Sequence, residues 1–406
     1  MSHSRLTSPL GASATGASTS IRPALLGKGF RPFFLLAALY AAGVVPIWLL
    51  MFGGQLDAAP HLGAMYWHAH EMVFGFAAAV IAGFLLTAVG NWTGRETAVG
   101  IPLALLAVLW MLGRVAILLG DVLPGALSAA VDLAFLPALA LVCTRPLLAA
   151  KSWRNYPLIA ILGGLTLANL GVHLGAHGIY PHWLRLGNIV AVDIVVLVVV
   201  VISGRVIPMF TRNTTGVATA RTLPWLDRLA ALAVALVALA DAAGLDLRVA
   251  AAASGIGAAA LFVRGFLFGA RQIWRHPLLW VLHAAHAFIA VGLLLRAGAS
   301  LTPELPWSSA LHALTAGGIG MATLGMMARV GLGHTGRMLV VPRSIAIAFG
   351  LVAAGAALRV LAGWLPPGAY LPSLSFAGLL WAAGFGIYAV VHGPILLSPR
   401  VDGRPG

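Results

Sequence analysis

Long apolar stretches, separated by short polar segments, follow one another along most of the chain. Each is about 20 residues long, the length that an α-helix needs to cross a bilayer. Turn signals such as Asp121 and Pro366-Pro367-Gly368 divide them. The pattern predicts an all-α polytopic membrane protein with twelve transmembrane helices, at residues 32–51, 66–89, 100–119, 123–143, 157–177, 183–210, 223–244, 249–269, 277–299, 307–331, 342–361 and 370–396.

Composition supports a surface that faces the lipid bilayer. Of the 406 residues, 60% are hydrophobic and 9% are charged, whereas soluble domains carry roughly 25% charged residues. The formal charge of +14 would suit nucleic acid, but the basic residues form short clusters between apolar stretches, so no nucleic-acid partner is expected. The single cysteine, Cys143, excludes internal disulfides and cysteine-based zinc or iron–sulfur sites.

The positions of the basic residues predict the topology. With twelve spans and a cytoplasmic N-terminus, all but five of the 25 Lys and Arg residues lie at cytoplasmic ends, where such residues are enriched. We therefore expect both termini to be cytoplasmic. The predicted parts are a disordered cytoplasmic tail over 1–28, a transmembrane domain over 29–398 and a C-terminal cytoplasmic tail over 399–406. The five exceptions are Arg114, Arg185, Arg248, Arg296 and Arg359.

One internal similarity links the second and tenth predicted spans. An offset of 242 residues matches His70 to His312 and Gly75 to Gly317. Coincidence in a chain rich in Ala, Gly and Leu is one interpretation. The other is a four-helix unit used three times, an arrangement that resembles the core of haem–copper oxidases at the level of fold only. That enzyme's adjacent histidine pair has no clear counterpart here, so oxygen reduction is not expected.

Histidines within the predicted spans suggest a bound metal or haem. An ionisable side chain at membrane depth costs at least about 2.5 kcal/mol on insertion scales, so each one requires a reason. Imidazole is a common ligand to haem iron, copper and zinc. At least seven of the 13 histidines fall within predicted spans: His68, His70, His173, His177, His283, His286 and His312.

The densest group is the run Trp67-His68-Ala69-His70-Glu71 in the second span. Residues two apart lie about 200° around a helix, so His68 and His70 cannot share a face, whereas His68 and Glu71 can. We interpret one histidine as a ligand and the other as held by Glu71 or bound to a second centre. The alternative is an interfacial cap anchored by Trp67.

Further histidines extend this prediction. The match between His70 and His312 predicts the two axial ligands of a haem between the second and tenth spans, although a lone histidine such as His312 is usually structural. His173 and His177, four apart on one helix face, suit two ligands on one metal, or else His177 caps its helix. His283 is a candidate ligand or a packing histidine.

Charged residues within the spans have open roles. Asp132, Asp193 and Asp241 could relay protons, support a metal ligand or bind an ion, and Asp193 lies deepest in its span. The arginines at the outer ends could pair with haem propionates, or their side chains could reach the interface.

Four stretches resemble the NnrS family: GFRPFF at 29–34, WHAHEMVFGF at 67–76, GRVIPMFTRN at 204–213, and 312–337, which ends in GLGHTGR. The resemblance covers nearly all of the chain beyond the tail. It implies a bacterial inner-membrane protein with haem b and copper, linked to denitrification and to the response to nitric oxide and nitrosative stress. The positions that match its motifs are His68, His70, Glu71, His312 and Arg205, with His173 and His283 in less distinctive surroundings.

The resulting hypothesis is a membrane protein that binds haem and copper and meets nitric oxide or a related small molecule. His70 and His312 would hold the haem, some of His68, His173 and His283 the copper, and Glu71, Asp193 and Arg205 would support them. A redox reaction and its electron donor stay open. The alternatives are a transporter or channel for a metal ion or small solute without a redox cofactor, and an assembly factor for another respiratory complex.

Overall fold

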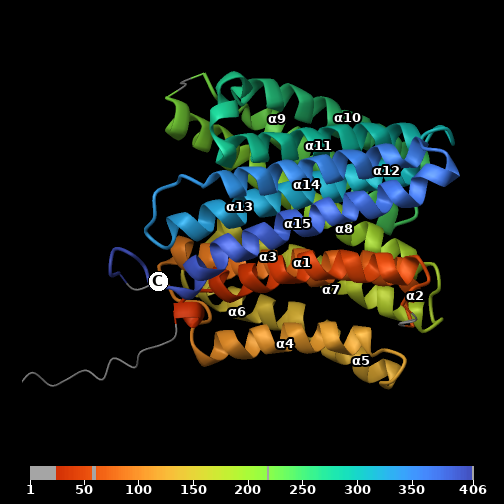
Figure 1. Cartoon of the computed structure of the whole chain (residues 1–406), viewed down its shortest axis with the longest axis horizontal. Helices are drawn as coiled ribbons and strands as arrows, with labels where there is room; N and C mark the ends of the chain where they lie inside the picture. The colour runs from red at the N-terminus through yellow and green to blue at the C-terminus, as the bar shows by residue number, and fades with distance from the viewer. Residues whose placement is uncertain (1–23, 57–60, 217–218, 405–406) are drawn as a thin grey trace, which may run out of the picture.

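The computed structural model of the protein describes residues 24–56, 61–216 and 219–404. These residues form helices joined by short connections, and they contain no strand. The helices run side by side along the long axis of the molecule (Figure 1). The all-α prediction is therefore confirmed, while residues 1–23 of the predicted tail lie outside the described residues.

The α-helices follow the chain in order. The first half has α1 (Phe30–Phe52), α2 (Gly63–His70), α3 (Ala78–Thr93), α4 (Ile101–Leu118), α5 (Gly125–Leu133), α6 (Phe135–Ala149), α7 (Pro157–Ala176) and α8 (Trp183–Thr215). The second half has α9 (Pro224–Ala242), α10 (Leu247–Leu267), α11 (Pro277–Ala299), α12 (Trp307–His312), α13 (Gly320–Gly333), α14 (Arg343–Leu361) and α15 (Pro367–Leu397). Four short 3₁₀ turns lie at η1 (Ala24–Leu26), η3 (Trp153–Asn155), η4 (Ala270–Arg275) and η6 (Ala362–Trp364).

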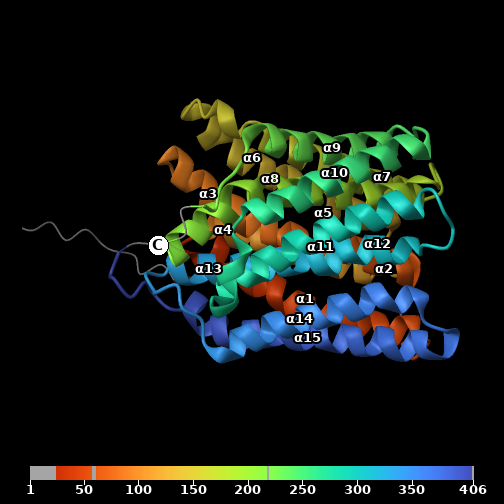
Figure 2. The ribbon, with the colours of Figure 1, turned by 90° about the horizontal axis from the view of Figure 1, so that it is seen from above.

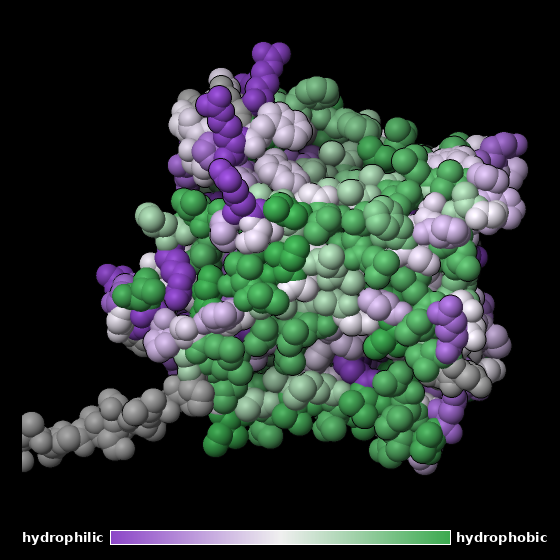
Figure 3. Space-filling model, viewed as in Figure 1, coloured by the Kyte–Doolittle hydropathy of each residue, from purple (hydrophilic) through white to green (hydrophobic). Residues whose placement is uncertain are grey.

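Each of the twelve predicted spans corresponds to one helix or to consecutive helices of one rod. Within the described residues, eleven rods are long and apolar enough to cross a membrane. The remaining helix, α9, has 19 residues but carries Asp227, Arg228 and Asp241. Figure 3 shows a broad apolar belt between two more polar ends of the molecule. The protein is thus a multi-pass membrane protein.

Local signals in the sequence set several helix ends. Proline occupies the first or second position of α4, α7, α9, α11 and α15, where its missing N–H has no helical partner to lose. Gly94 and Gly216 follow α3 and α8 with φ of 65° and 70°, the left-handed conformation that commonly ends a helix.

The first and last described spans meet at one end of the bundle. Arg31, at the start of α1, donates hydrogen bonds to the carbonyl oxygens of Leu396 (2.8 Å) and Ser398 (2.6 Å), at the end of α15. We call this the terminal end, and Figure 1 marks it with the C label. The opposite, distal end contains the starts of α2, α8 and α12 and the end of α7. The candidate residues gather there.

The two rods that carry His70 and His312 are irregular in the same register. A π-helical turn, η2 (Glu71–Ala77), follows α2, and a second one, η5 (Ala313–Ile319), follows α12. Each turn begins directly after the histidine, so the two turns coincide under the 242-residue offset. π-helical turns are rare and frequent at functional sites. The coincidence extends the match between these two spans, while the threefold repeat stays a prediction.

These two rods also form the centre of the bundle. In their apolar stretches 78% and 72% of the residues are buried, against 56% or less in the other nine spans. Both π-helical turns contact α8, one from the first half of the chain and one from the second. The turn η5 also packs on α11 and α14. Figure 2 shows α1, α14 and α15 along one side of the bundle and α9 and α10 toward the other. Residues on the central rods therefore face protein rather than lipid.

Candidate functional site

A cavity of about 330 Å³ lies at the distal half of the bundle, between α1, α2, η2, α8, α12, η5, α14 and α15. His68 from α2 and His312 from α12 both line it. Most of the remaining wall is apolar and aromatic, with Phe76 and Trp381 among its larger side chains. The cavity thus brings two imidazoles from distant parts of the sequence to one apolar space.

The His312 ring is held by its own helix. Its Nδ1–H donates a hydrogen bond to the carbonyl oxygen of Ser308 at 2.7 Å. Because this bond fixes the proton on Nδ1, the lone pair lies on Nε2, which has no hydrogen-bond partner among the described residues. A metal-ligating histidine typically donates its other ring N–H to a carbonyl or carboxylate in this way.

The His68 ring is held by stacking. It lies on the Trp48 ring, with 4.1 Å between the ring centroids and 24° between the planes. Its Nδ1 is buried without a hydrogen-bond partner. Buried polar atoms in native proteins are nearly always partnered, so an exception requires an explanation. A ligand in the cavity would supply one.

Two arginines border the same cavity, Arg185 from α8 and Arg359 from α14. Arg185 is exposed. Arg359 is buried, its Nε and Nη1 have no hydrogen-bond partner, and its guanidinium lies 5.9 Å from the centroid of the Tyr370 ring. Neither arginine pairs with a carboxylate within the described ranges. Unpaired cations beside an apolar space suit the acidic groups of a ligand.

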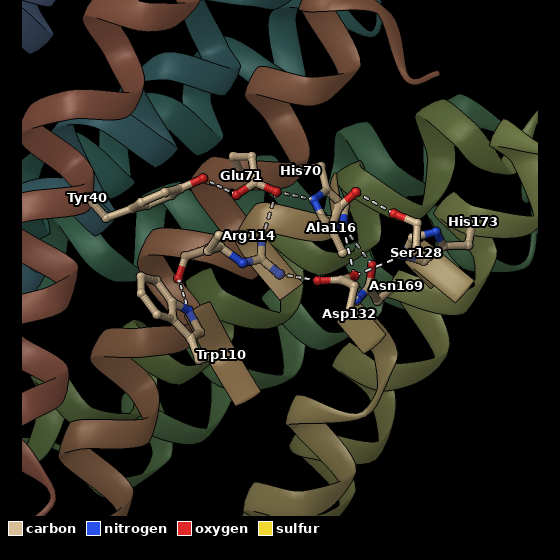
Figure 4. A network of polar contacts seen from close by, with 11 residues as sticks. Tyr40, His70, Glu71, Trp110, Arg114, Ala116, Ser128, Asp132, Asn169 and His173 are labelled. Atoms are coloured by element: carbon tan, nitrogen blue, oxygen red, sulfur yellow. Dashed lines mark hydrogen bonds and ion pairs between the residues drawn. The ribbon is translucent and has the colours of Figure 1, made fainter. Parts of the chain in front are cut away.

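His70 faces away from this cavity, into a buried polar network (Figure 4). Its Nδ1 lies 2.9 Å from Glu71 Oε1. Its Nε2 lies 3.0 Å from Asn169 Oδ1 and 3.2 Å from Asp132 Oδ2. Both ring nitrogens are therefore occupied by protein partners.

Arg114 joins the two carboxylates of this network. Its Nη1 donates to Glu71 Oε1 at 2.7 Å, and its Nη2 pairs with Asp132. Glu71 also accepts a hydrogen bond from the hydroxyl of Tyr40. Asp132 accepts from Asn169 Nδ2 at 2.8 Å. All members except Tyr40 are at least nine-tenths buried, and a buried charge is tolerated only when it is paired in this manner.

A family model described as the NnrS protein matches residues 24–400, nearly the whole chain. The chain belongs to the NnrS family. No curated protein matches it. The resemblance seen in the sequence is thus confirmed, and membership makes the protein a membrane protein of the nitric oxide response. The family stretch at 67–76 provides His68 to the cavity and His70 and Glu71 to the network.

His68 and His70 lie on different faces of the helix, as their spacing predicts. One of the two histidines was expected to be held by Glu71, and that histidine is His70. Glu71 does not share a face with His68, although their spacing would allow it. Its carboxylate lies with His70, because Arg114 and Tyr40 draw it into the network.

The structure does not bring together the two histidines that were predicted to hold a haem. His68 and His312 line the cavity, and His70 does not. The 242-residue offset pairs His70 with His312 in the sequence, but Glu71, Asn169 and Asp132 occupy the ring of His70.

The other predicted supporting residues lie apart from both regions. Asp193 accepts a hydrogen bond from Arg296 Nη1 at 2.6 Å, and the same guanidinium pairs with Asp241. Arg205 is exposed in the terminal half of α8. The structure therefore does not bring Asp193 or Arg205 to His68, His70 or His312.

His283 is also separate. Its Nε2 lies 3.1 Å from the hydroxyl of Thr211, near the start of α11 and the terminal end. Its neighbour His286 donates from Nε2 to the carbonyl oxygen of Leu261 at 2.9 Å. Neither histidine lines the cavity that holds His68 and His312.

His173 belongs to the network and to a second group of histidines. Its Nε2 lies 2.9 Å from Asp132 Oδ2. One ligand atom each of His173, His61 and His177 lies within 4.8 Å of the others. Burial lowers the pKa of His61, which lies in the connection before α2, and the neighbouring His173 and His177 imidazoles lower it further.

Sequence reasoning missed His61 and Asn169. His61 lies five residues before the predicted second span, so the criterion of membrane depth did not select it. Asn169 precedes His173 by four residues, and that helical spacing was the available signal that both side chains point to one partner.

Proposed function

We propose that this NnrS family member binds haem b in the cavity, where His68 and His312 would hold it, and serves the response to nitric oxide and nitrosative stress. The observation that carries the proposal is that two imidazoles from different spans face one apolar space, each with an available ring nitrogen. In this respect the two residues differ from His70, whose ring nitrogens both have partners.

The cavity suits the shape and chemistry of a porphyrin. Its volume of about 330 Å³ lies in the range of sites for small molecules and cofactors. Aromatic walls such as Phe76 and Trp381 offer faces for a flat apolar ring. Arg185 and Arg359 would receive the two propionates, which need cations when they leave water. No single wall supplies all three features, so the bundle must assemble to form the site.

The protein's own contacts would fix the orientation of both ligands. The Ser308 carbonyl holds the proton of His312 on Nδ1, so Nε2 would be the nitrogen that binds the metal. Stacking on Trp48 limits rotation of the His68 ring. The apolar walls exclude water, which together with the axial ligands sets the redox potential. Haem held by these residues would supply one-electron chemistry and a metal that can bind nitric oxide.

Other parts of the proposal concern location and the second metal. We place the protein in the bacterial inner membrane with the terminal end in the cytoplasm, because the predicted topology assigns all but five of the 25 Lys and Arg residues to the cytoplasmic side. The cavity would then lie toward the periplasm. Copper would be bound outside the cavity, and nitric oxide or a related small molecule would be the partner of the centres. The association with denitrification rests on the family resemblance.

Absorption spectra of the detergent-purified protein, oxidised and reduced, test the haem proposal. We expect a Soret band and a sharp α band from the wild type, and loss or change of both in His68→Ala and His312→Ala. His182→Ala, an exposed histidine at the distal end, is the matched control and should keep the wild-type spectrum. Unchanged spectra in both cavity variants would overturn the assignment.

The absorption spectrum also tests the alternative function, a transporter or channel without a redox cofactor. A colourless wild type, purified after expression with ample haem, would contradict haem binding. The cavity would then favour a small-solute path lined by His68, His312 and Arg359.

A further inference from the structure

Three histidines gather at the distal end of the bundle, outside the haem cavity. They are His61, before α2, and His173 and His177, at the end of α7. One ring nitrogen of each lies within 4.8 Å of the others. The rings of His61 and His177 are nearly parallel, 5° apart, with 5.7 Å between their centroids. Two segments about 110 residues apart in sequence thus bring three imidazoles to one point.

Several ring nitrogens of these imidazoles have no hydrogen-bond partner among the described residues. Both ring nitrogens of His61 are buried without a hydrogen-bond partner, and so is Nδ1 of His173. No hydrogen bond involves the exposed His177 ring within the described residues. Three buried nitrogens without partners in one cluster are unusual in a native structure. A bound cation would account for Nδ1 of His173 and for one of the two nitrogens of His61.

Asp132 orients the deepest member of the cluster. His173 Nε2 lies 2.9 Å from Asp132 Oδ2, so the proton is held on that side and Nδ1, which has no hydrogen-bond partner, keeps its lone pair. A carboxylate that accepts from one ring nitrogen while the other binds metal is the usual support for a histidine ligand. Asp132 is itself fixed by Arg114 and Asn169, which makes the direction of the His173 ring rigid.

Two glycines leave room for the rings. A Cβ atom on Gly120 would collide with the His61 ring, and one on Gly125 would collide with the His177 ring. Neither glycine has a positive φ, so backbone conformation does not require them. The space that they leave is what the imidazoles occupy.

We infer that His61, His173 and His177 bind a late first-row transition-metal ion, copper or zinc, at the distal end of the bundle. Three nitrogen donors suit these ions, whereas magnesium and calcium prefer oxygen. A fourth position would face outward beside the exposed His177 and remain open to water or a small ligand. The inference deepens the proposed function by placing its second metal, and the geometry of the cluster does not depend on the haem.

Metal analysis of the purified protein tests the inference. Wild type, His61→Ala, His177→Ala and the control His182→Ala are expressed with added copper or, separately, with added zinc. Copper and zinc per protein are measured by mass spectrometry, and copper(II) is examined by electron paramagnetic resonance for coupling to imidazole nitrogen. We expect about one equivalent of one of the two metals in the wild type and in His182→Ala. We expect at least a tenfold loss of that metal in both cluster variants.

The absorption spectrum separates this inference from the haem proposal. His61→Ala and His177→Ala should keep the haem bands, whereas His68→Ala should lose haem and keep the metal. A colourless protein that still binds one metal equivalent would overturn the haem assignment only. The metal site is overturned if both cluster variants retain the wild-type metal content, or if the wild type takes up neither copper nor zinc.

Discussion

The two faces of the helix at residues 68–71 serve different regions of the molecule. On one face His70 and Glu71 enter a network in which each ring nitrogen and both carboxylates have partners. On the other face, His68 lines a cavity that His312 also lines, and His68 Nδ1 has no hydrogen-bond partner. His70 is fully buried, and His68 is partly buried at the cavity wall. The feature that distinguishes the candidate ligand from the structural histidine is an available ring nitrogen.

Among the variants that test this difference between the two faces, Arg114→Met should cause the largest loss of stability. The substitution removes the guanidinium that pairs with both Glu71 and Asp132, and leaving a buried charge uncompensated costs about 3–5 kcal/mol. We expect a strongly lowered unfolding temperature in detergent. Arg248→Met, an exposed arginine at the start of α10, is the control and should unfold near the wild-type temperature. Equal unfolding temperatures for Arg114→Met and wild type would contradict the role of the network.

Separate glutamine substitutions of the two histidines should have opposite effects on stability and on haem binding. His70→Gln should lower the free energy of unfolding by about 1–3 kcal/mol, because the shorter amide cannot meet Glu71 and Asn169 together, and should leave the haem spectrum unchanged. His68→Gln should do the reverse, with little loss of apoprotein stability and loss of the haem bands. Thermal unfolding and absorption spectra of both variants decide this. Haem loss in His70→Gln at wild-type stability would restore the pair predicted from the sequence.

The sequence was sufficient for the fold and for the opposite faces of His68 and His70, because helix length and helical angle depend on local spacing alone. It was not sufficient to decide which histidine faces the cavity. That choice depends on Arg114 and Asn169, which lie 43 and 99 residues from their partners in the network. His61 was missed for the same reason, since only the folded bundle brings its connection to the end of α7.

A smaller loss of stability is expected from added volume at Gly75, where the network packs against α1. A Cβ atom on Gly75 would lie 2.7 Å from the Tyr40 ring and 2.9 Å from Glu71 Oε2. Gly75→Ala should therefore cost about 1–3 kcal/mol through overpacking. Gly43→Ala is the matched control, since a Cβ atom there has no neighbour within 4 Å, and it should be neutral or slightly stabilising. Equal thermal stability of the two variants would show that the contact between α1 and η2 tolerates more volume than the structure suggests.

The smallest effect is expected on haem affinity, from a substitution of Arg359 at the edge of the cavity. Arg359 is a buried cation with two unpartnered nitrogens and no carboxylate beside it, so the empty cavity gains little from its charge. A haem propionate would pair with it, and a charge-assisted hydrogen bond contributes about 1.5–3 kcal/mol. Arg359→Met should thus weaken haem binding by about tenfold while the apoprotein becomes no less stable. Haem titration followed by the Soret band gives the affinity, with Arg248→Met, an exposed arginine at the start of α10, as the control. If both variants bind haem as the wild type does, no propionate reaches Arg359. If instead the Arg359 apoprotein is destabilised, the guanidinium supports the bundle through Tyr370 and does not serve a ligand.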